Sequence, residues 1–363
     1  MVFFKLRKIC RFAAVLCLVL FAALAGLSGS LQVQPSAAHA QSAGNVPGGT
    51  LGNLNDPEMW RFARRGGCGT VSIPDKSAGC LVQADGDVWR AVKNGPLSEI
   101  GGWSMLGILV VLALFYILRG KIRVDAGLSG QTIERFNGTE RFAHWLTASS
   151  FVVLGLTGLN VLYGRYVIKP LLGADAFSWL TMVGKFTHNY VGFAFMIGIA
   201  LMFVLWIRDN IPSLVDLKWL AVGGGLFSKG VHPPSERFNA GQKFIFWAVV
   251  LGGGSLALSG VALLFPFEIH PWAGTFALLN KLGFALPTSL SALQETQLSS
   301  IWHSTLALVM IVIIVGHIYI GSVGMEGAID AVGTGQVDLN WAKEHHSLWV
   351  EEHLDDVKNQ PAE

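Results

Sequence analysis

The chain has 363 residues, of which 52% are hydrophobic and only 14% are charged. Ordinary soluble domains carry about 25% charged residues, so this composition assigns most of the chain to a lipid bilayer. The net charge of +2 is too small for a nucleic-acid-binding protein. None of the four cysteines has CxxC, CxxCH or ferredoxin-type spacing, which excludes an iron–sulfur cluster and a covalently attached haem.

The N-terminus has the order of an export signal: basic residues, a long apolar stretch and small residues up to Ala40. We expect residues 1–40 to be a signal peptide, or an uncleaved signal anchor, and residues 41–100 to be periplasmic. Cys68 and Cys80 lie in that segment, where an oxidising compartment favours a disulfide between them.

Five stretches without Asp, Glu, Lys or Arg follow, and each is long enough for one helix to cross the membrane, which takes about 20 residues. They lie between Glu99 and Arg119, Arg141 and Arg165, Lys185 and Arg208, Lys243 and Glu268, and Glu295 and Glu326. Lys and Arg gather in the loops after the first and third stretches, which predicts that these loops are cytoplasmic.

The expected fold is therefore an all-α membrane protein. We predict an extra transmembrane helix at 101–120, a four-helix membrane domain at 121–325 and a cytoplasmic C-terminal tail at 326–363. From Asp338 onward the tail has the propensity of a surface helix that ends in charged residues. We expect it to be a docking element or a soluble end.

Four histidines stand in or at the edge of the apolar stretches: His144, His188, His303 and His317. A single one is explained as well by a hydrogen bond to a neighbouring helix, but ionisable residues at membrane depth are rare and usually functional. His303 and His317 share one stretch, about 21 Å apart along a helix and within about 40° of the same face. They therefore suit two ligand sites at two depths.

Depth also predicts the partners of these two histidines. His188 can meet His303 near the outer surface, and His144 can meet His317 near the cytoplasmic surface. Neutral imidazole is a good axial ligand of haem iron, so the sequence predicts two six-coordinate b-type haems in a four-helix bundle. A non-redox bundle or membrane anchor, whose histidines bind a metal or protons, is the alternative from another class of protein.

Two basic residues beside these histidines have two explanations. Arg141 and Lys185 could pair with haem propionates at the membrane surfaces. The explanation that we prefer is that they are the positive flanks of membrane spans.

Four motifs resemble the gamma (cytochrome b) subunit of membrane-bound formate dehydrogenases, over about Glu134 to Val350. They are ERFAHW at 140–145, GKFTHNYVG at 184–192, RFNAGQK at 237–243 and GMEGAIDAVGTGQVDLNWAKEHH at 324–346. The histidine pattern alone is shared with hydrogenase cytochrome b subunits. Compact members of the family begin near ERFAHW, whereas this chain adds a leader, an exported segment and a further span before it.

The resemblance implies the same haem b ligand pairs as the depth argument, with haem iron as the bound metal. It also implies that a quinone, menaquinone or ubiquinone, binds beside the inner haem at Asn239, Gly241 and Gln242. Amides can hydrogen-bond quinone carbonyls, and glycine permits close backbone approach. Without the resemblance, Asn239 would be explained as the N-cap of a helix.

The resemblance further implies a bacterial inner-membrane subunit that transfers electrons and does not itself oxidise formate. Its partners would be a molybdenum- or tungsten-containing catalytic subunit and an iron–sulfur subunit on the periplasmic side, as well as membrane lipid. Electrons would pass from the outer to the inner haem and reduce quinone near the cytoplasm. A hydrogenase or another periplasmic dehydrogenase is the alternative donor.

Overall fold

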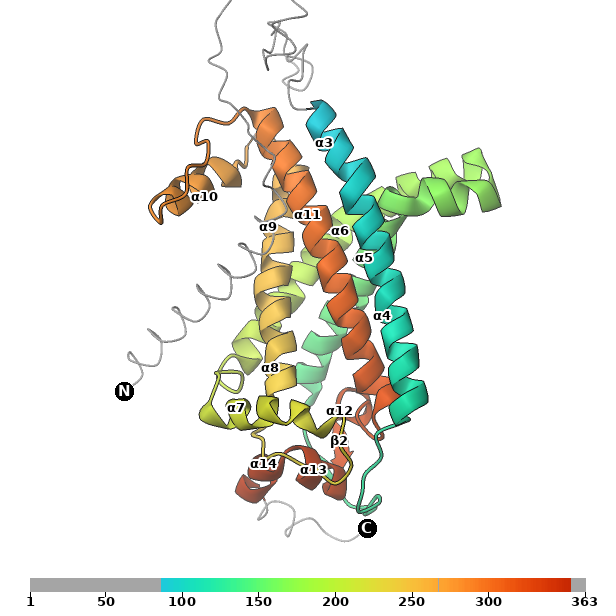
Figure 1. Ribbon diagram of the computed structural model, residues 1–363, viewed down its shortest axis with the longest axis vertical. Coiled ribbons are helices and arrows are strands. Elements are labelled where there is room, and N and C mark those ends of the chain that lie inside the picture. Colours follow the sequence, from blue (N-terminus) through green and yellow to red (C-terminus); the bar gives the residue numbers. More distant parts are fainter. Residues whose placement is uncertain (1–85, 267, 354–363) are drawn as a thin grey trace, which may run out of the picture. The chain divides into compact units, whose positions relative to one another are not determined.

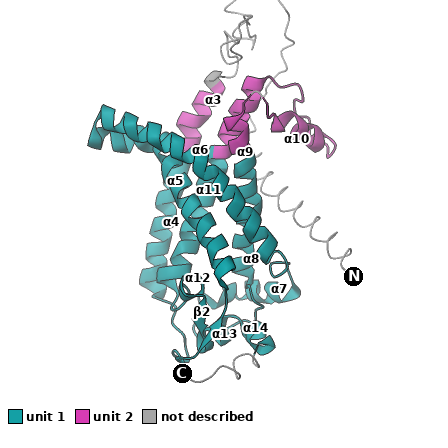
Figure 2. Cartoon of the chain, turned by 180° about the vertical axis from the view of Figure 1, so that it is seen from behind, with its two compact units in different colours: residues 1–17, 100–258, 304–363 teal, residues 18–99, 259–303 magenta. Residues whose placement is uncertain are grey.

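The computed structural model describes residues 86–266 and 268–353. The predicted signal peptide, the predicted disulfide and most of the predicted periplasmic segment lie outside the described residues. Within them the chain forms two compact units (Figure 2). Unit 1 holds residues 100–258 and 304–353, and unit 2 holds residues 86–99 and 259–303.

Five helical segments are long and apolar enough to cross a membrane, which confirms the all-α membrane fold (Figure 1). They are Val88–Arg119, Gly138–Leu172, Ala174–Trp206, Ala240–Leu264 and Ala292–Gly324. Large apolar side chains point outward from them, as expected of surfaces that face lipid: in α4, Trp103 is 73% exposed and Leu118 is 84% exposed.

Three of these spans contain a π-helical turn. The first span consists of α3 (Gly86–Val92), the π-helical turn η3 (Lys93–Leu97) and α4 (Ser98–Arg119). The fourth span consists of α8 (Ala240–Trp247), the π-helical turn η5 (Ala248–Gly253) and α9 (Gly254–Leu264). The fifth span consists of α11 (Ala292–Tyr319) and the π-helical turn η6 (Ile320–Gly324). Such turns are frequent at functional sites, because the extra residue widens the helix and changes the direction of the side chains around it.

The second and third spans are longer than their charge-free stretches predicted. Helix α5 (Gly138–Leu172) has 35 residues and α6 (Ala174–Trp206) has 33, and Gly173 alone joins them. At φ 84° Gly173 has a backbone conformation that glycine adopts without steric cost. The expected connection between Arg165 and Lys185 is therefore almost entirely helical, because a charged residue ends an apolar stretch but does not break a helix.

Helices α5 and α6 pack along their length in unit 1. The closest approach is at Gly198, where an added Cβ would lie 3.1 Å from the backbone N and Cα of Thr147. Small residues at such positions let two membrane helices come close enough for extensive van der Waals contact.

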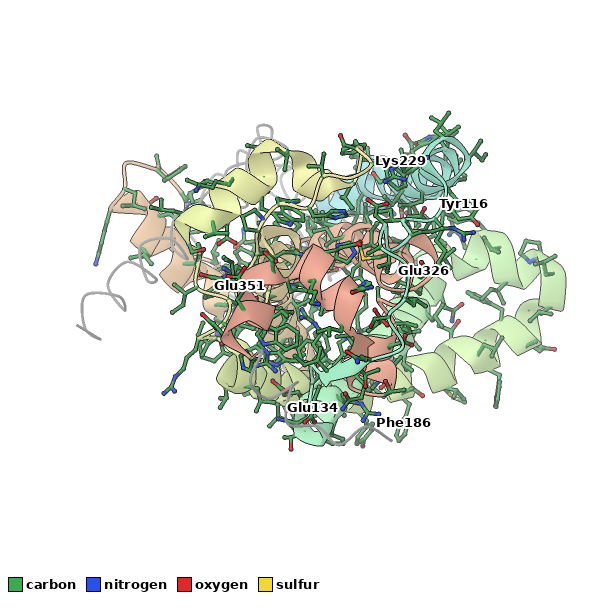
Figure 3. The ribbon with its side chains drawn as sticks, turned by 90° about the horizontal axis from the view of Figure 1, so that it is seen from below. Tyr116, Glu134, Phe186, Lys229, Glu326 and Glu351 are labelled. Atoms are coloured by element: carbon green, nitrogen blue, oxygen red, sulfur yellow. The ribbon has the colours of Figure 1, made fainter. Side chains whose placement is uncertain are left out.

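The C-terminal tail folds onto unit 1, and the surface that it forms there is called the tail end. Strand β1 (Thr132–Glu134) pairs antiparallel with β2 (Gln336–Asp338), and Ile133 lies opposite Val337. The short helices of the tail are α12 (Asp330–Gly333), α13 (Leu339–His345) and α14 (Ser347–Glu352). Figure 3 shows this end of unit 1, with Glu134 of β1 and Glu326 and Glu351 of the tail labelled. Two further short helices of unit 1, α7 (Leu214–Ala221) and η4 (Gly223–Gly225), precede α8.

The prediction of a surface helix in the tail is correct about the helix, which forms as α13 and α14, and wrong about its exposure. The helix breaks at His346, whose φ of −147° is not helical, and both halves are held by packing. Trp341 is only 3% exposed, Trp349 5% and His346 0%. Helix propensity describes single residues, whereas here the burial of two tryptophans decides the conformation.

The tail end also buries two adjacent histidines. Burial, followed by the nearby charges of His232 and Arg135, lowers the pKa of His345 to about 4, although Asp125 acts in the opposite direction. Burial, followed by Arg135, lowers the pKa of His346 well below its usual value. Both imidazoles are therefore neutral at physiological pH.

Unit 2 has a small core of its own around α10 (Pro271–Asn280). Trp272, Phe276 and Leu279 form that core, and Leu286, Leu290, Leu298 and Trp302 pack against it. The carboxylate of Glu295 accepts hydrogen bonds from the backbone N–H groups of Trp272 and Ala273 at 2.8 and 2.7 Å. These bonds satisfy the N-terminus of α10.

Replacing Gly198 with alanine should lower the free energy of unfolding by about 1–3 kcal/mol, because the new Cβ would overlap Thr147 and push α5 away from α6. Gly192→Ala on the same helix is the matched control, since nothing lies within 4 Å of its added Cβ. That control should keep or raise stability, as alanine favours helix over glycine. Unfolding in mixed detergent measures both, and a Gly198→Ala protein as stable as the control would contradict this packing.

Acid should weaken the tail end. The unfolded chain protonates His345 near its ordinary pKa of about 6.5, whereas the folded chain does so only near 4. The stabilisation from the neutral ring is therefore complete above pH 6.5 and is lost as the pH falls toward 4, at no more than about 1.4 kcal/mol per pH unit for one histidine. His345→Gln should reduce this slope in denaturant unfolding; an unchanged slope would contradict the buried neutral state.

Candidate functional site

Unit 1 encloses a cavity of about 1020 Å³ between its helices and the tail end. This volume is at the upper end of the roughly 300–1,000 Å³ of ligand pockets, and it suits a large ligand. Five of the seven residues predicted to bind cofactor or quinone line it: His144, His317, Asn239, Gly241 and Gln242. Helices α5, α11 and α8 bring them together from three distant parts of the chain.

The rings of His144 and His317 both line this cavity and lie close together, with centroids 6.5 Å apart and planes at 59°. A metal ion held by an imidazole nitrogen on either side, at about 2.0–2.1 Å each, separates two ring centroids by roughly 6.4 Å. The observed distance fits two axial ligands of one iron. The predicted pairing of these two histidines therefore has the required geometry.

The surroundings of the two rings fit a haem as well. Apolar side chains such as Phe151, Val249 and Ile313 line the cavity beside them. Two of the π-helical turns border it, through Val249 of η5 and Ile320 of η6. The Nδ1 atom of His144 is buried and has no hydrogen-bond partner among the described residues, so this imidazole is not held by a structural hydrogen bond through that atom.

His188 is oriented by a hydroxyl group. Its Nδ1 lies 2.8 Å from Oγ1 of Thr157, and that hydroxyl donates its own hydrogen to the carbonyl of Val153 at 2.8 Å. The imidazole Nδ1–H is therefore the donor to Thr157, which leaves the lone pair of Nε2 for an iron. A partner of this kind on the second nitrogen is usual for metal-binding histidines.

His303 has a similar partner in unit 2. Its Nδ1 lies 3.0 Å from Oγ of Ser259. His188 and His303 belong to different units, and their pairing around a second haem stays a prediction.

Asn239 and Gln242 form the N-terminal cap of α8. The side-chain oxygen of Asn239 accepts from the N–H of Gln242 at 3.0 Å, and that of Gln242 accepts from the N–H of Asn239 at 3.1 Å. The capping explanation is therefore correct, and it does not exclude ligand binding. The cap uses the two amide oxygens, so that the NH₂ groups can donate to a ligand in the cavity.

Gly241 has a packing role of its own. A Cβ at this position would lie 3.0 Å from the ring of Trp219, so a side chain here would displace that tryptophan. Both residues line the cavity. Glycine at this position therefore keeps the helix start close to the cavity wall.

The two basic residues considered as propionate partners make structural contacts instead. Arg141 donates to the backbone carbonyls of Val332 and Gly333, and so ties α5 to the tail. Lys185 donates to the side chain of Asn189 one turn later at 2.9 Å. Neither of them lines the cavity in unit 1.

The cavity is lined by three arginines that were predicted only as loop residues and not as part of the site: Arg119, Arg123 and Arg135. Arg135 is 2% exposed. Burial, followed by the charge of Arg237, lowers the pKa of Arg135 to about 9, against the opposite effect of Glu140, so the guanidinium stays charged at neutral pH. Its neighbours in sequence, Glu134 and Phe136, give no signal of this burial.

Comparison with known proteins identifies the family of the chain. Residues 135–334, more than half of the chain, match the family model described as prokaryotic cytochrome b561. The cytochrome b556(fdo) subunit of formate dehydrogenase from Escherichia coli strain K12 is 28% identical over 227 residues, which are 61% of this chain and 93% of that protein. The nitrate-inducible cytochrome b556(Fdn) subunit from the same strain is 25% identical over 228 residues, 61% and 91% of the two chains.

A third relative is the formate dehydrogenase cytochrome b556 subunit of Haemophilus influenzae, 23% identical over 225 residues, or 61% of this chain and 84% of that one. The resemblance to formate dehydrogenase cytochrome b subunits is thereby confirmed. The family match is consistent with the five apolar helices and with the neighbouring rings of His144 and His317. This chain belongs to the prokaryotic cytochrome b561 family, as a multi-pass membrane cytochrome b that binds haem b and takes part in electron transfer.

Proposed function

We propose that this chain is the di-haem subunit that passes electrons from a periplasmic formate dehydrogenase to quinone. The observation that supports this most directly is the 6.5 Å separation of the His144 and His317 rings beside Asn239 and Gln242 in one cavity. Formate is the preferred donor because the relatives reported above are all formate dehydrogenase subunits. The remaining subunits would be a molybdenum- or tungsten-containing catalytic subunit and an iron–sulfur subunit.

The orientation follows from the distribution of basic residues. Lys and Arg concentrate in the loops after the first and third spans, which favours a cytoplasmic tail end and a periplasmic opposite end. Formate would then be oxidised outside and quinone reduced inside, at the bacterial inner membrane. An electron that moves inward against 100 mV stores about 2.3 kcal/mol, so this arrangement separates charge across the membrane.

The haem ligands are the four histidines of the membrane spans. His144 and His317 would hold the haem at the tail end, and His188 and His303 the other one. Each haem supplies a one-electron carrier that can be reduced and oxidised without leaving the protein. The chain's own contribution is to orient the imidazoles, as Thr157 does for His188.

Quinone binding rests on the amide groups at the start of α8. The NH₂ groups of Asn239 and Gln242 would donate to a quinone carbonyl, while their oxygens keep the helix cap. Gly241 would contribute by letting Trp219 pack against the start of α8 in the cavity wall beside these amides. The apolar cavity wall would exclude bulk water from the ring.

The donor is tested in membranes that contain the complete complex. Formate should reduce the b-type haems and added quinone should reoxidise them. Haem reduction by hydrogen and not by formate would replace formate dehydrogenase with a hydrogenase as the partner. A purified chain without any reducible b-type spectrum would reject the redox function.

His317→Ala should remove one haem of two, because the tail-end iron loses one of its two ligands. The reduced-minus-oxidised spectrum per protein should fall to about half, and formate-driven quinone reduction should fall by at least 100-fold. His270→Ala is the control, as this exposed histidine lies in unit 2 and only contacts the carbonyl of Pro266. Retention of both haems by His317→Ala would contradict the assignment.

Asn239→Asp separates the two roles of this residue. Aspartate caps a helix as well as asparagine, so stability should change by less than about 0.5 kcal/mol, whereas the lost NH₂ donor should raise the KM for quinone roughly tenfold. Asn137→Asp is the matched control: Asn137 makes the same capping box at α5 but does not line the cavity. Equal kinetics for the two variants would leave Asn239 with the structural role alone.

A further inference from the structure

One wall of the cavity is a cluster of nitrogen atoms without partners, contributed by Arg135, Trp341, His345 and His346 and called here the tail polar cluster. In the described part of the chain, five of its buried atoms have no hydrogen bond: Nε and Nη1 of Arg135, Nε1 of Trp341, and Nε2 of both histidines. Each such buried group costs about 1–3 kcal/mol if it is left unsatisfied. Five in one place indicate a polar occupant.

The tail polar cluster is compact. The centroid of the Trp341 ring lies 5.1 Å from that of His345 and 5.4 Å from that of His346. The guanidinium carbon of Arg135 lies 5.6 Å from the centroid of the Trp341 ring. Arg135, Trp341 and His346 are at most 3% exposed. Groups at these separations can share bound waters, each of which makes two to four hydrogen bonds.

On its outer side the cluster reaches solvent. The ring of His345 lies 6.3 Å from that of His232, whose Nε2 is 3.0 Å from Oδ2 of Asp125. The side chains of His232 and Asp125 are 31% and 48% exposed. Glu344 lies 3.9 Å from the same imidazole nitrogen, so two carboxylates face His232 at the surface.

On its inner side the cluster reaches the cap of α8. Nη2 of Arg135 donates to the carbonyl of Arg237 at 2.6 Å and lies 3.5 Å from Oε1 of Gln242. Gln242 lines the same cavity as His317. Polar groups therefore follow one another from exposed Asp125 to the residues that the proposed function assigns to quinone.

We propose that the tail polar cluster holds ordered water and conducts protons from solution to the quinone at Asn239 and Gln242. The inference rests on the proposed function and identifies the groups that supply its protons. Reduction of a quinone to a quinol takes up two electrons, one from each of two ferrous haem oxidations, and two protons, which form the two new O–H bonds. The protons enter at Asp125 and His232.

The imidazole and guanidinium side chains of this cluster have different roles. A neutral imidazole accepts a proton on one nitrogen and releases the proton on the other, so His345 can relay protons, while His346 positions water through Nε2. Arg135 keeps its proton and orients the water. It also holds the imidazoles neutral, together with His232, while Asp125 acts in the opposite direction. Nδ1–H of His346 donates to the carbonyl of Glu236 at 3.0 Å, with Oγ of Ser235 3.2 Å away, so Nε2 of His346 is the nitrogen that can accept from water.

The test is made on the full chain with its haems, in vesicles. The haems are reduced with dithionite and mixed with a short-chain ubiquinone analogue between pH 6 and 9, and haem oxidation is followed by absorbance. His345→Gln should slow oxidation about tenfold or more at pH 8, with a larger solvent isotope effect and partial recovery in added imidazole. His353→Gln is the matched control, because this tail histidine does not line the cavity.

Two readouts are independent of turnover. Equilibrium binding of the quinone analogue, followed by tryptophan fluorescence, should be the same in His345→Gln and wild type, since a relay residue does not touch the ring. Hydroxyl-radical footprinting of the full chain, read by mass spectrometry, modifies side chains that lie beside bound water and should therefore modify His345 and Trp341. Protection of both side chains would mean a dry cluster and would overturn the proposal.

The outcomes separate the two levels of the argument. A wild-type chain with two haems that quinone does not oxidise would reject the proposed function and, with it, this inference. A normal wild type and an equally fast His345→Gln would reject the proton route alone. His232→Gln at the surface is the second variant if His345→Gln does not fold, and it should slow oxidation above pH 7; an unchanged rate at every pH would also reject the route.

Discussion

Arg237 lies between two carboxylates, 2.8 Å from Glu140 and 2.8 Å from Asp209, and this ion triad joins three segments that are far apart in sequence. Glu140 is in the first turn of α5, one turn before His144, and Arg237 precedes the cap of α8. The indole of Trp206 also donates to Glu140 at 2.8 Å. Glu140 is only 5% exposed, so its charge requires these partners. The triad therefore fixes where an imidazole and the cap amides enter the cavity.

The tail depends on the same triad through Arg135. Arg135 and Arg237 each donate to the other's carbonyl, at 2.6 and 2.8 Å. The Arg135 guanidinium then lies 5.3 Å from the ring of Trp349 and 5.6 Å from that of Trp341, distances at which a cation is attracted to an aromatic face. The tail thus becomes one wall of the cavity, because Arg135 connects its tryptophans to the ion triad.

The sequence predicted the parts of this protein that follow from the membrane alone. A stretch without charged residues must form a helix in lipid, so the five spans were predictable, and the depth of His144 and His317 was enough to pair them. The same argument underestimated α5 and α6, because Arg165 and Lys185 leave the apolar layer without ending a helix. Membrane thickness sets the length of the apolar stretch, but the helix can continue beyond the membrane.

Where the environment is aqueous, single-residue properties were less informative. The tail was predicted as an exposed helix because its residues favour helix, yet Trp341 and Trp349 are buried. Asn239 had two explanations that seemed exclusive, and the structure makes them compatible, since the amide oxygen caps α8 and the NH₂ group is left to donate. Arg135 escaped notice because its role depends on partners more than 100 residues away, Arg237 and Trp341.

The histidines differ in what holds them, and the difference fits their places in the molecule. His188 and His303 have hydroxyl partners on neighbouring spans, Thr157 and Ser259, so contacts between the spans set their orientation. Nδ1 of His144 has no such partner in the described chain, and its cavity is closed instead by loops and the tail. Under the proposed function, a site that would hold only a fixed cofactor benefits from rigid helix contacts, whereas one that would also admit quinone and protons needs a wall with polar groups that reach solvent. The tail end supplies that wall.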